Sequence, residues 1–381
     1  MKKIYSVLLL VLSIMYLSAC GGKGADLLIL NWGDYIAEDL LIAFEEEYGV
    51  SVKVVTTDSN EQMYASITNR TAEYDLVVPS DYMLDQMAQE GIIKKLDYTR
   101  LENYSEDMFV AELSALMNAE ANSSFKGYYI PYFWGSLGIM YNKNKQGVEE
   151  AVIEHGWSVF FEQDLLPKNA KIGMYSVSRD ALACAQLYMG YSLNTTSIAE
   201  IDECMNLLRN TDFDAWGSDD LKVKVSRGNL DVALVYSGDF FDAWYADIEA
   251  EEGMEEDEDF VSNTEKYHIY APTDYNNVFF DAMAIPNTCT NEDLAYKFLD
   301  FLLQEENSYT NAEFVGYCPT VQTVYDEIIN DEEGWGDVIA IDAYDPTNII
   351  NTEGSKYEVY RYLGAETYIY IEEKFTNVLI R

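Results

Sequence analysis

Residues 27–82 carry the strongest fold signal in the chain. They read LLILNWGDYIAEDLLIAFEEEYGVSVKVVTTDSNEQMYASITNRTAEYDLVVPSDY, and short apolar runs alternate there with segments whose apolar residues recur at helical spacing. We expect strands at residues 27–30, 50–55 and 74–78, and helices at residues 38–48, 61–70 and 81–90. This order predicts an α/β fold with a mostly parallel sheet and helices on both of its faces.

Two loops that combine aromatic and acidic residues follow strands in this stretch. WGDY (32–35) comes after the first strand, and PSDY (79–82) comes after the third. Ligands of open α/β sheets bind at the carboxyl ends of the strands. Both loops are therefore candidates for one binding site.

The alternation of strand and helix continues through the rest of the chain. We expect further strands at residues 172–175, 232–236 and 278–286, and further helices at residues 180–189, 198–209, 291–304, 321–329 and 357–374. The run EAEEGMEEDED (249–259) could bind a metal ion. Runs of like charge without fixed geometry are usually solvated, so we expect a surface loop there and no metal site.

Composition excludes several classes of protein. The chain has 381 residues, 49% of them hydrophobic, which is ample for large cores and excludes a disordered chain. Lys and Arg number 24 against 67 Asp and Glu, a formal net charge of −43 that repels nucleic acid. Two histidines cannot form a His-rich metal site, and the five cysteines include no C-x-x-C pair. No phosphate-binding loop or other cofactor motif occurs, so we expect no cofactor.

The N-terminus has the pattern of a secretory signal. Residues 1–20, MKKIYSVLLLVLSIMYLSAC, place two lysines before a short apolar segment. Their end, Leu17-Ser18-Ala19-Cys20, resembles the lipobox of bacterial lipoproteins, which implies a signal peptide at residues 1–19, a lipid on Cys20 and a tether at residues 20–25. The alternative is an ordinary signal peptide in which the cysteine is a coincidence. The other cysteines (Cys184, Cys204, Cys289, Cys318) lie in apolar or helical contexts and are expected to be small core residues.

Carboxylates recur beside aromatic residues at the ends of the expected strands. Examples are Asp34 with Trp32, Asp239 with Tyr236, and Asp281 with Phe279. Carboxylates neutralise ammonium groups and aromatic faces cover methylenes, so this pairing suits an organic cation. Two alternatives stay open here: the aromatic residues belong to the core, or paired carboxylates hydrolyse a glycosidic bond.

Several sequence blocks, in order, resemble the extracytoplasmic spermidine/putrescine-binding proteins of ABC polyamine importers. They are Asn31-Trp32-x-x-Tyr35, residues 74–82, Ile130-Pro131-Tyr132-x-Trp134-Gly135, residues 190–196, Asp281-x-x-Ala284-Ile285-Pro286 and Gly316-Tyr317-x-Pro319-Thr320. The resemblance implies a two-lobed periplasmic-binding-protein fold that closes on ligand about a hinge. Lobe 1 would hold residues 26–134 and 282–325, and lobe 2 residues 135–281 and 326–381.

The resemblance also implies a ligand site of ten residues. They are Trp32, Asp34, Tyr35, Ser80, Tyr82, Asp180, Tyr236, Phe279, Asp281 and Tyr317. Asp281 matches the central carboxylate of the family, and Asp180 stands where the family has a glutamate that binds an amine. Three departures bear on which polyamine is preferred: Gly33 replaces a hydroxyl residue, Val177 replaces a second acid, and Tyr360 replaces a glutamine.

These observations together favour a receptor over an enzyme. We expect a lipid-anchored, monomeric protein outside the cytoplasm that captures a polyamine and delivers it to an ABC permease without breaking covalent bonds. The alternatives are a receptor for another cationic solute and a secreted carbohydrate-active enzyme that uses paired carboxylates.

Overall fold

A computed structural model describes residues 24–251, 262–331 and 334–380. The expected signal segment, Cys20 and most of the acidic run 249–259 lie outside the described residues. In the described part of the chain no helix is both long and apolar enough to cross a membrane.

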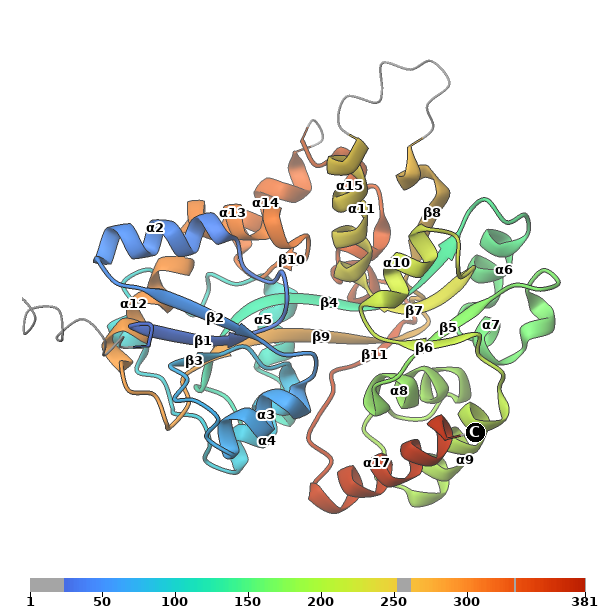
Figure 1. Ribbon diagram of the computed structural model, residues 1–381, viewed down its shortest axis with the longest axis horizontal. Coiled ribbons are helices and arrows are strands. Elements are labelled where there is room, and N and C mark those ends of the chain that lie inside the picture. The colour runs from blue at the N-terminus through green and yellow to red at the C-terminus, as the bar shows by residue number, and fades with distance from the viewer. Residues whose placement is uncertain (1–23, 252–261, 332–333, 381) are drawn as a thin grey trace, which may run out of the picture.

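One mixed sheet extends through the length of the molecule (Figure 1). Its strands follow the order β2-β1-β3-β9-β4-β7-β5-β6, while β8 and β10 pair with β4 and β11 pairs with β9. The strands are β1 Leu27–Asn31, β2 Val52–Thr56, β3 Leu76–Val77, β4 Tyr129–Asn142, β5 Ile172–Tyr175, β6 Ala215–Gly217, β7 Val232–Tyr236, β8 Tyr267–Tyr270, β9 Tyr275–Ala284, β10 Cys318–Pro319 and β11 Lys356–Glu358.

Strands β4 and β9 join the two halves of the sheet. They pair antiparallel along most of their length, with Trp134 opposite Phe280 and Gly135 opposite Phe279. Towards its start β4 also pairs with β10, and from Leu137 onward it pairs with β7. Figure 1 shows both strands running from the half that holds β1–β3 to the half that holds β5–β7.

The expectation of a mostly parallel sheet is correct only within each half. The pairs β1–β2 and β1–β3 are parallel, as are β5–β6 and β5–β7. At the centre, β4 pairs antiparallel with β7 and with β9. Alternation of strand and helix predicts local crossovers, and it carries no signal for two long strands that cross between halves.

Helices cover both faces of each half of the sheet (Figure 1). In the half around β1, α2 and α13 lie on one face and α3 and α4 on the other; around β5, α10 and α11 lie opposite α8, α9 and α17. The helices are α2 Glu38–Tyr48, α3 Asn60–Thr68, α4 Asp81–Gln89, α5 Ala111–Met117, α6 Val148–His155, α7 Ser158–Phe161, α8 Ser178–Met189, α9 Ile198–Asn210, α10 Asp220–Ser226, α11 Ser237–Glu251, α12 Glu292–Leu302, α13 Glu305–Val315, α14 Gln322–Asn330, α15 Gly336–Ile339, α16 Thr347–Ile350 and α17 Ala365–Leu379.

The final helix begins later than the sequence suggested. Residues 357–374 were expected to be helical, but Lys356–Glu358 forms β11, which pairs parallel with the start of β9. Gly364 then takes φ of +82° immediately before α17. A positive φ is compatible with glycine and incompatible with a continuing helix, so α17 cannot begin before this residue.

Buried apolar side chains fill the space between the sheet and its helices. Phe44 in α2, Trp134 in β4 and Phe280 in β9 are each fully buried. A large apolar side chain buried in this way contributes roughly 1.5–3 kcal/mol relative to leaving it in water. This packing stabilises the central strands against the helices that cover them.

Candidate functional site

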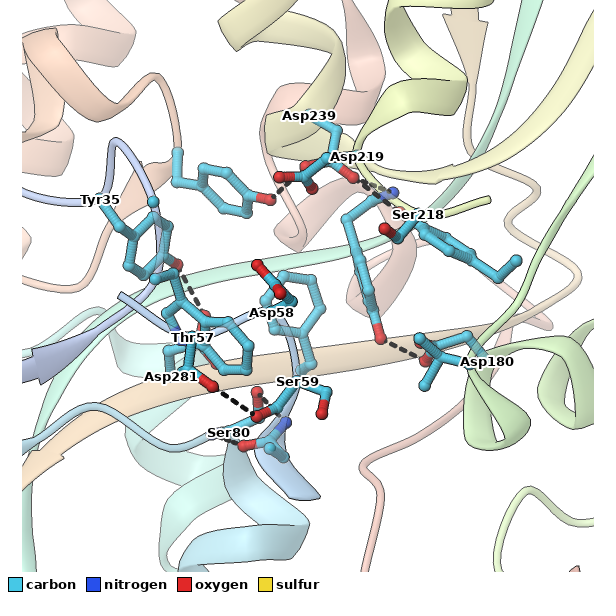
Figure 2. Close-up of a pocket in the computed structure, with 18 of the residues that line it drawn as sticks. Tyr35, Thr57, Asp58, Ser59, Ser80, Asp180, Ser218, Asp219, Asp239 and Asp281 are labelled. Atoms are coloured by element: carbon cyan, nitrogen blue, oxygen red, sulfur yellow. Dashed lines mark hydrogen bonds between the residues drawn. The ribbon is translucent and has the colours of Figure 1, made fainter. Parts of the chain in front are cut away.

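A cavity of about 310 Å³ lies between the two halves of the molecule. All ten residues that the sequence suggested for the site line it: Trp32, Asp34, Tyr35, Ser80, Tyr82, Asp180, Tyr236, Phe279, Asp281 and Tyr317. Figure 2 shows Tyr35, Ser80 and Asp281 on one side of this cavity and Asp180 on the other. The carboxyl ends of β1, β3, β5 and β7 supply most of these positions, as expected for an open α/β sheet.

Asp281 lies in β9, where the strand passes beneath the cavity. Its side chain accepts a hydrogen bond of 2.7 Å from the Tyr35 hydroxyl, and the residue is only 6% exposed. Burial raises the pKa of this carboxyl to about 6, although interactions with the hydroxyls of Ser80 and Tyr35 oppose that rise. Within the described residues Asp281 forms no ion pair with a lysine or an arginine.

Asp180 presents a second buried carboxylate from the first turn of α8. Its Oδ1 atom accepts a hydrogen bond of 2.5 Å from the hydroxyl of Tyr236, the last residue of β7. Burial raises the pKa of Asp180 to about 7, and the Tyr236 hydrogen bond only partly opposes this shift. Two carboxylates on opposite sides of the cavity are therefore held in an environment that disfavours their charge.

Aromatic rings form much of the cavity wall. The ring of Tyr317 meets Tyr35 edge-on at a centroid distance of 5.2 Å, and Phe279 meets Tyr236 in the same way at 4.8 Å. Tyr360 also lines the cavity, and its hydroxyl has no hydrogen-bond partner among the described residues. Rings arranged in this way offer faces and edges to an aliphatic chain or to a cation.

Three further residues noted in the sequence differ in whether they line the cavity and in what they contribute to it. Asp34 lies exposed at φ of +47° in the loop after β1, a conformation that Asp tolerates better than most residues. Asp81 is fully buried, accepts a hydrogen bond of 2.6 Å from the backbone N–H of Tyr82, and does not line the cavity. Val177, the residue before α8, does line it and contributes no polar group.

Several lining residues are absent from the ten-residue site that the resemblance implied, although Asp239 had been noted in the sequence as a carboxylate beside Tyr236. They are Asp58 and Glu61 after β2, Tyr175 at the end of β5, and Asp219, Lys222, Asp239 and Asp242 around α10 and α11. The rule that sites gather at the carboxyl ends of strands would also have found Asp58 and Tyr175. No feature of the sequence distinguishes Lys222 from the other lysines of the chain.

The charges of the lining are strongly unequal. In the part of the chain that the structure describes, eight carboxylates and one ammonium group, that of Lys222, line the cavity, together with eight aromatic rings. An anion would meet net repulsion there, whereas a compact organic cation finds both counter-charges and apolar walls. Among the described residues no group of three or more His, Cys, Asp and Glu side chains is placed to hold a metal ion.

Comparisons with known proteins agree with this geometry. The model of a family described as bacterial extracellular solute-binding protein matches residues 39–336. The spermidine/putrescine-binding periplasmic protein of Escherichia coli K12 is 28% identical over 337 residues, which cover 87% of this chain and 88% of that protein. The putrescine-binding periplasmic protein SpuD of Pseudomonas aeruginosa is 29% identical over 285 residues, which cover 73% of each chain.

A solved structure has the same architecture along nearly the whole chain. The spermidine/putrescine ABC transporter substrate-binding protein PotD of Streptococcus pneumoniae superimposes with a TM-score of 0.68 at 27% sequence identity. The match covers 93% of this chain and 98% of the other.

Proposed function

We propose that this chain, which belongs to the family of bacterial extracellular solute-binding proteins, is the receptor of an ABC importer for polyamines. It would capture spermidine, putrescine or both outside the cytoplasm and deliver them to the permease. The names of the relatives support this substrate class, because one is described as spermidine/putrescine-binding and the other as putrescine-binding.

The cavity supplies the observation that carries the proposal. Three of its carboxylates are buried, at Asp180, Asp239 and Asp281, and each accepts a hydrogen bond from a tyrosine hydroxyl. Among the described residues, Asp180 and Asp281 form no ion pair with a lysine or an arginine. A buried carboxylate without a counter-charge is costly, and an ammonium group of the ligand removes that cost. Aromatic side chains between the carboxylates suit the methylene chain of a polyamine.

In this proposal the protein binds without catalysing a reaction. The two lobes would be residues 26–134 with 282–325 and residues 135–281 with 326–381, and they would close about β4 and β9. Support comes from the pairing of β4, which is bonded to β10 at Trp134 and to β7 from Leu137 onward. Ligand would then be enclosed between the lobes, as in hinge-closing receptors.

The proposal further includes a monomeric receptor held at the membrane by lipid on Cys20. The lipobox-like residues Leu17 to Cys20 support the anchor, and they lie outside the described part of the chain. Cys20→Ser should release the protein from the membrane fraction of cells. Continued membrane association of that variant would contradict lipid anchoring through Cys20.

A thermal-shift screen of the whole protein tests the substrate class. Putrescine, spermidine, a neutral disaccharide and calcium chloride would each be added at millimolar concentration. Ligand at a hundredfold excess over Kd stabilises a protein by about 2.7 kcal/mol, so a polyamine that binds should raise Tm clearly. A response to the disaccharide alone would favour a carbohydrate-active protein instead.

A further inference from the structure

Among the residues that the structure describes, Lys222 is the one cation of the cavity lining, and it is already paired with carboxylates. It lies in α10, its side chain is 14% exposed, and its Nζ atom lies 2.8 Å from Oδ2 of Asp242 and 3.7 Å from Oδ1 of Asp239. Figure 2 shows Asp219 and Asp239 together on the wall opposite Asp281 and Ser80. Lys222 thus brings a primary ammonium group, the same group that ends a polyamine, into the binding cavity.

The surroundings of Asp239 fix this ion pair in place. Its carboxylate also accepts hydrogen bonds of 2.7 Å from the Tyr175 hydroxyl and 3.3 Å from the Tyr317 hydroxyl. The backbone N–H of Tyr236 donates a third, of 3.2 Å. With these partners and Lys222, Asp239 has little capacity left to bind a ligand ammonium.

Lys222 stays charged in this position. Burial alone would lower the pKa of its ammonium group, but the charges of Asp239, Asp219 and Asp242 raise the pKa above its usual value. The pKa of Asp219 is itself raised, chiefly by the neighbouring charge of Asp239. Without Lys222, the carboxylates of Asp219, Asp239 and Asp242 would be left to accept a cation of the ligand.

A count of buried charges follows from these contacts. Of the described carboxylates that line the cavity, only Asp180, Asp239 and Asp281 are buried. Asp239 is paired with Lys222, whereas Asp180 and Asp281 form no ion pair with any cation in the described residues. Two buried carboxylates are thus left for ligand ammonium groups.

We propose that Lys222 is a specificity-determining residue: its tethered ammonium group fills a third cation position and so selects a diamine over longer polyamines. The inference rests on the proposed polyamine function. A third ammonium group that approached Asp239 and Asp242 would meet the like charge of Lys222 and lose its hydration without gaining a free buried carboxylate. A diamine such as putrescine has no such group.

Calorimetric titration of the whole protein with putrescine and spermidine tests this role. The wild type should bind putrescine more tightly than spermidine, and Lys222→Gln should shift the ratio of the two affinities toward spermidine by at least about tenfold. Lys222→Arg keeps the positive charge and should keep the wild-type order. Lys224→Gln is the matched control, since Lys224 lies in the same helix, is more exposed, and pairs with Asp220 away from the buried carboxylates.

The outcomes separate this inference from the proposed function. Wild-type protein that binds neither amine contradicts the proposed function. Two results would contradict the role of Lys222 but leave the proposed function standing. They are a wild-type protein that prefers spermidine, and a Lys222→Gln variant with native Tm and an unchanged ratio of the two affinities. If Lys222 only stabilises the packing of α10 against α11, its loss should lower the affinity for both amines equally and lower Tm. That result would also overturn the inference. Should Lys222→Gln fail to fold, Lys222→Met and the wild-type order of affinities decide the question.

Discussion

Asp281 shows how a single residue of the cavity opposes stability in the absence of ligand. Its carboxyl has an ordinary pKa of 3.8 and a pKa of about 6 in the fold, because the side chain is buried. A raised pKa means that the folded state binds the proton more tightly than the unfolded chain. The protein therefore loses stability as pH rises from about 4 through 6, and a bound cation restores it.

Replacing this carboxylate should remove binding without removing the fold. Asp281→Asn keeps the shape and an oxygen for the Tyr35 hydroxyl, but it cannot neutralise an ammonium group. We expect polyamine affinity to fall by about two orders of magnitude or more, since breaking a buried pair costs about 3–5 kcal/mol. Above pH 6 the ligand-free variant should melt no lower than the wild type.

Asp81→Asn is the matched control for this comparison. Asp81 is as deeply buried as Asp281 but lies outside the cavity lining, and its carboxylate accepts a hydrogen bond from the backbone N–H of Tyr82. Its effect on affinity should be much smaller in calorimetric titration. Equal losses of affinity in the two variants would show that Asp281 does not contact the ligand.

Affinity for polyamines should rise with pH between 5 and 8. The pKa values of Asp281 and Asp180 are about 6 and about 7, whereas alkylammonium groups stay protonated below about pH 9. At pH 5 both carboxyls are largely protonated and cannot attract the ligand; at pH 8 both are ionised. We expect an increase of about one to three orders of magnitude.

Proton release offers a separate check of this pH dependence. A cation stabilises the ionised carboxylates, so binding near pH 6.5 should release protons, and the heat of binding should differ between buffers of different ionisation enthalpy. An affinity that stays flat from pH 5 to 8, with no proton release, would contradict a site built on Asp180 and Asp281.

At the scale of elements, local segments could be predicted from the sequence and the central strand could not. The helices at residues 38–48 and 198–209 carry clear apolar spacing, and the structure has them at Glu38–Tyr48 and Ile198–Asn210. Strand β4 was not expected, because it contains Pro131, Gly135 and Gly138, and proline and glycine are unfavourable inside a central strand.

The structure explains why β4 tolerates each of these three residues. Pro131 lies at an irregularity in the pairing with β9, where a lost N–H donor does least harm. A Cβ atom at Gly135 would lie 3.0 Å from the ring of Phe279, and one at Gly138 would lie 2.6 Å from Ile269. The glycines thus make room for side chains of neighbouring strands, and that requirement exists only in the folded chain.

The start of α11 gives a prediction at this scale. Gly238 lies directly against the ring of Tyr317, so that a Cβ atom there would come within 1.8 Å of the ring. Gly238→Ala must displace Tyr317 and break its hydrogen bond to Asp239. We expect polyamine affinity to fall at least about tenfold, which corresponds to 1.4 kcal/mol, in calorimetric titration.

Gly336→Ala is a suitable control for that substitution. Gly336 begins α15, and a Cβ atom there would meet nothing within 4 Å. Both variants add one methyl group in a helix, but only the first disturbs the cavity. Unchanged affinity in Gly238→Ala would show that the position of Tyr317 does not matter for the ligand.

At the scale of the whole molecule, the resemblance pointed to ten residues that lie around one cavity, but not to every residue that lines it. Ten residues that lie up to 285 positions apart in the sequence, from Trp32 to Tyr317, line one cavity because β4 and β9 bring both halves together. Lys222 could not be found this way, since its role depends on the turn of α10 that points it at Asp239 and Asp242.

The proposed closure about the crossing strands would involve the whole molecule. Because the cavity is lined by both halves and joined through β4 and β9, ligand should draw the halves together. Small-angle scattering should show a smaller radius of gyration with saturating putrescine than without it. Asp281→Asn at the same putrescine concentration should give the radius of the ligand-free protein.

Calorimetric titration of the wild-type protein with putrescine and spermidine at pH 7.5, with a neutral disaccharide as a parallel titrant, tests the central claim most directly. A cavity with eight carboxylates and one ammonium group predicts saturable binding of a polyamine at one molecule per chain and no heat from the sugar. Absence of binding by both polyamines at millimolar concentration, or saturable binding of the sugar alone, would contradict a polyamine receptor.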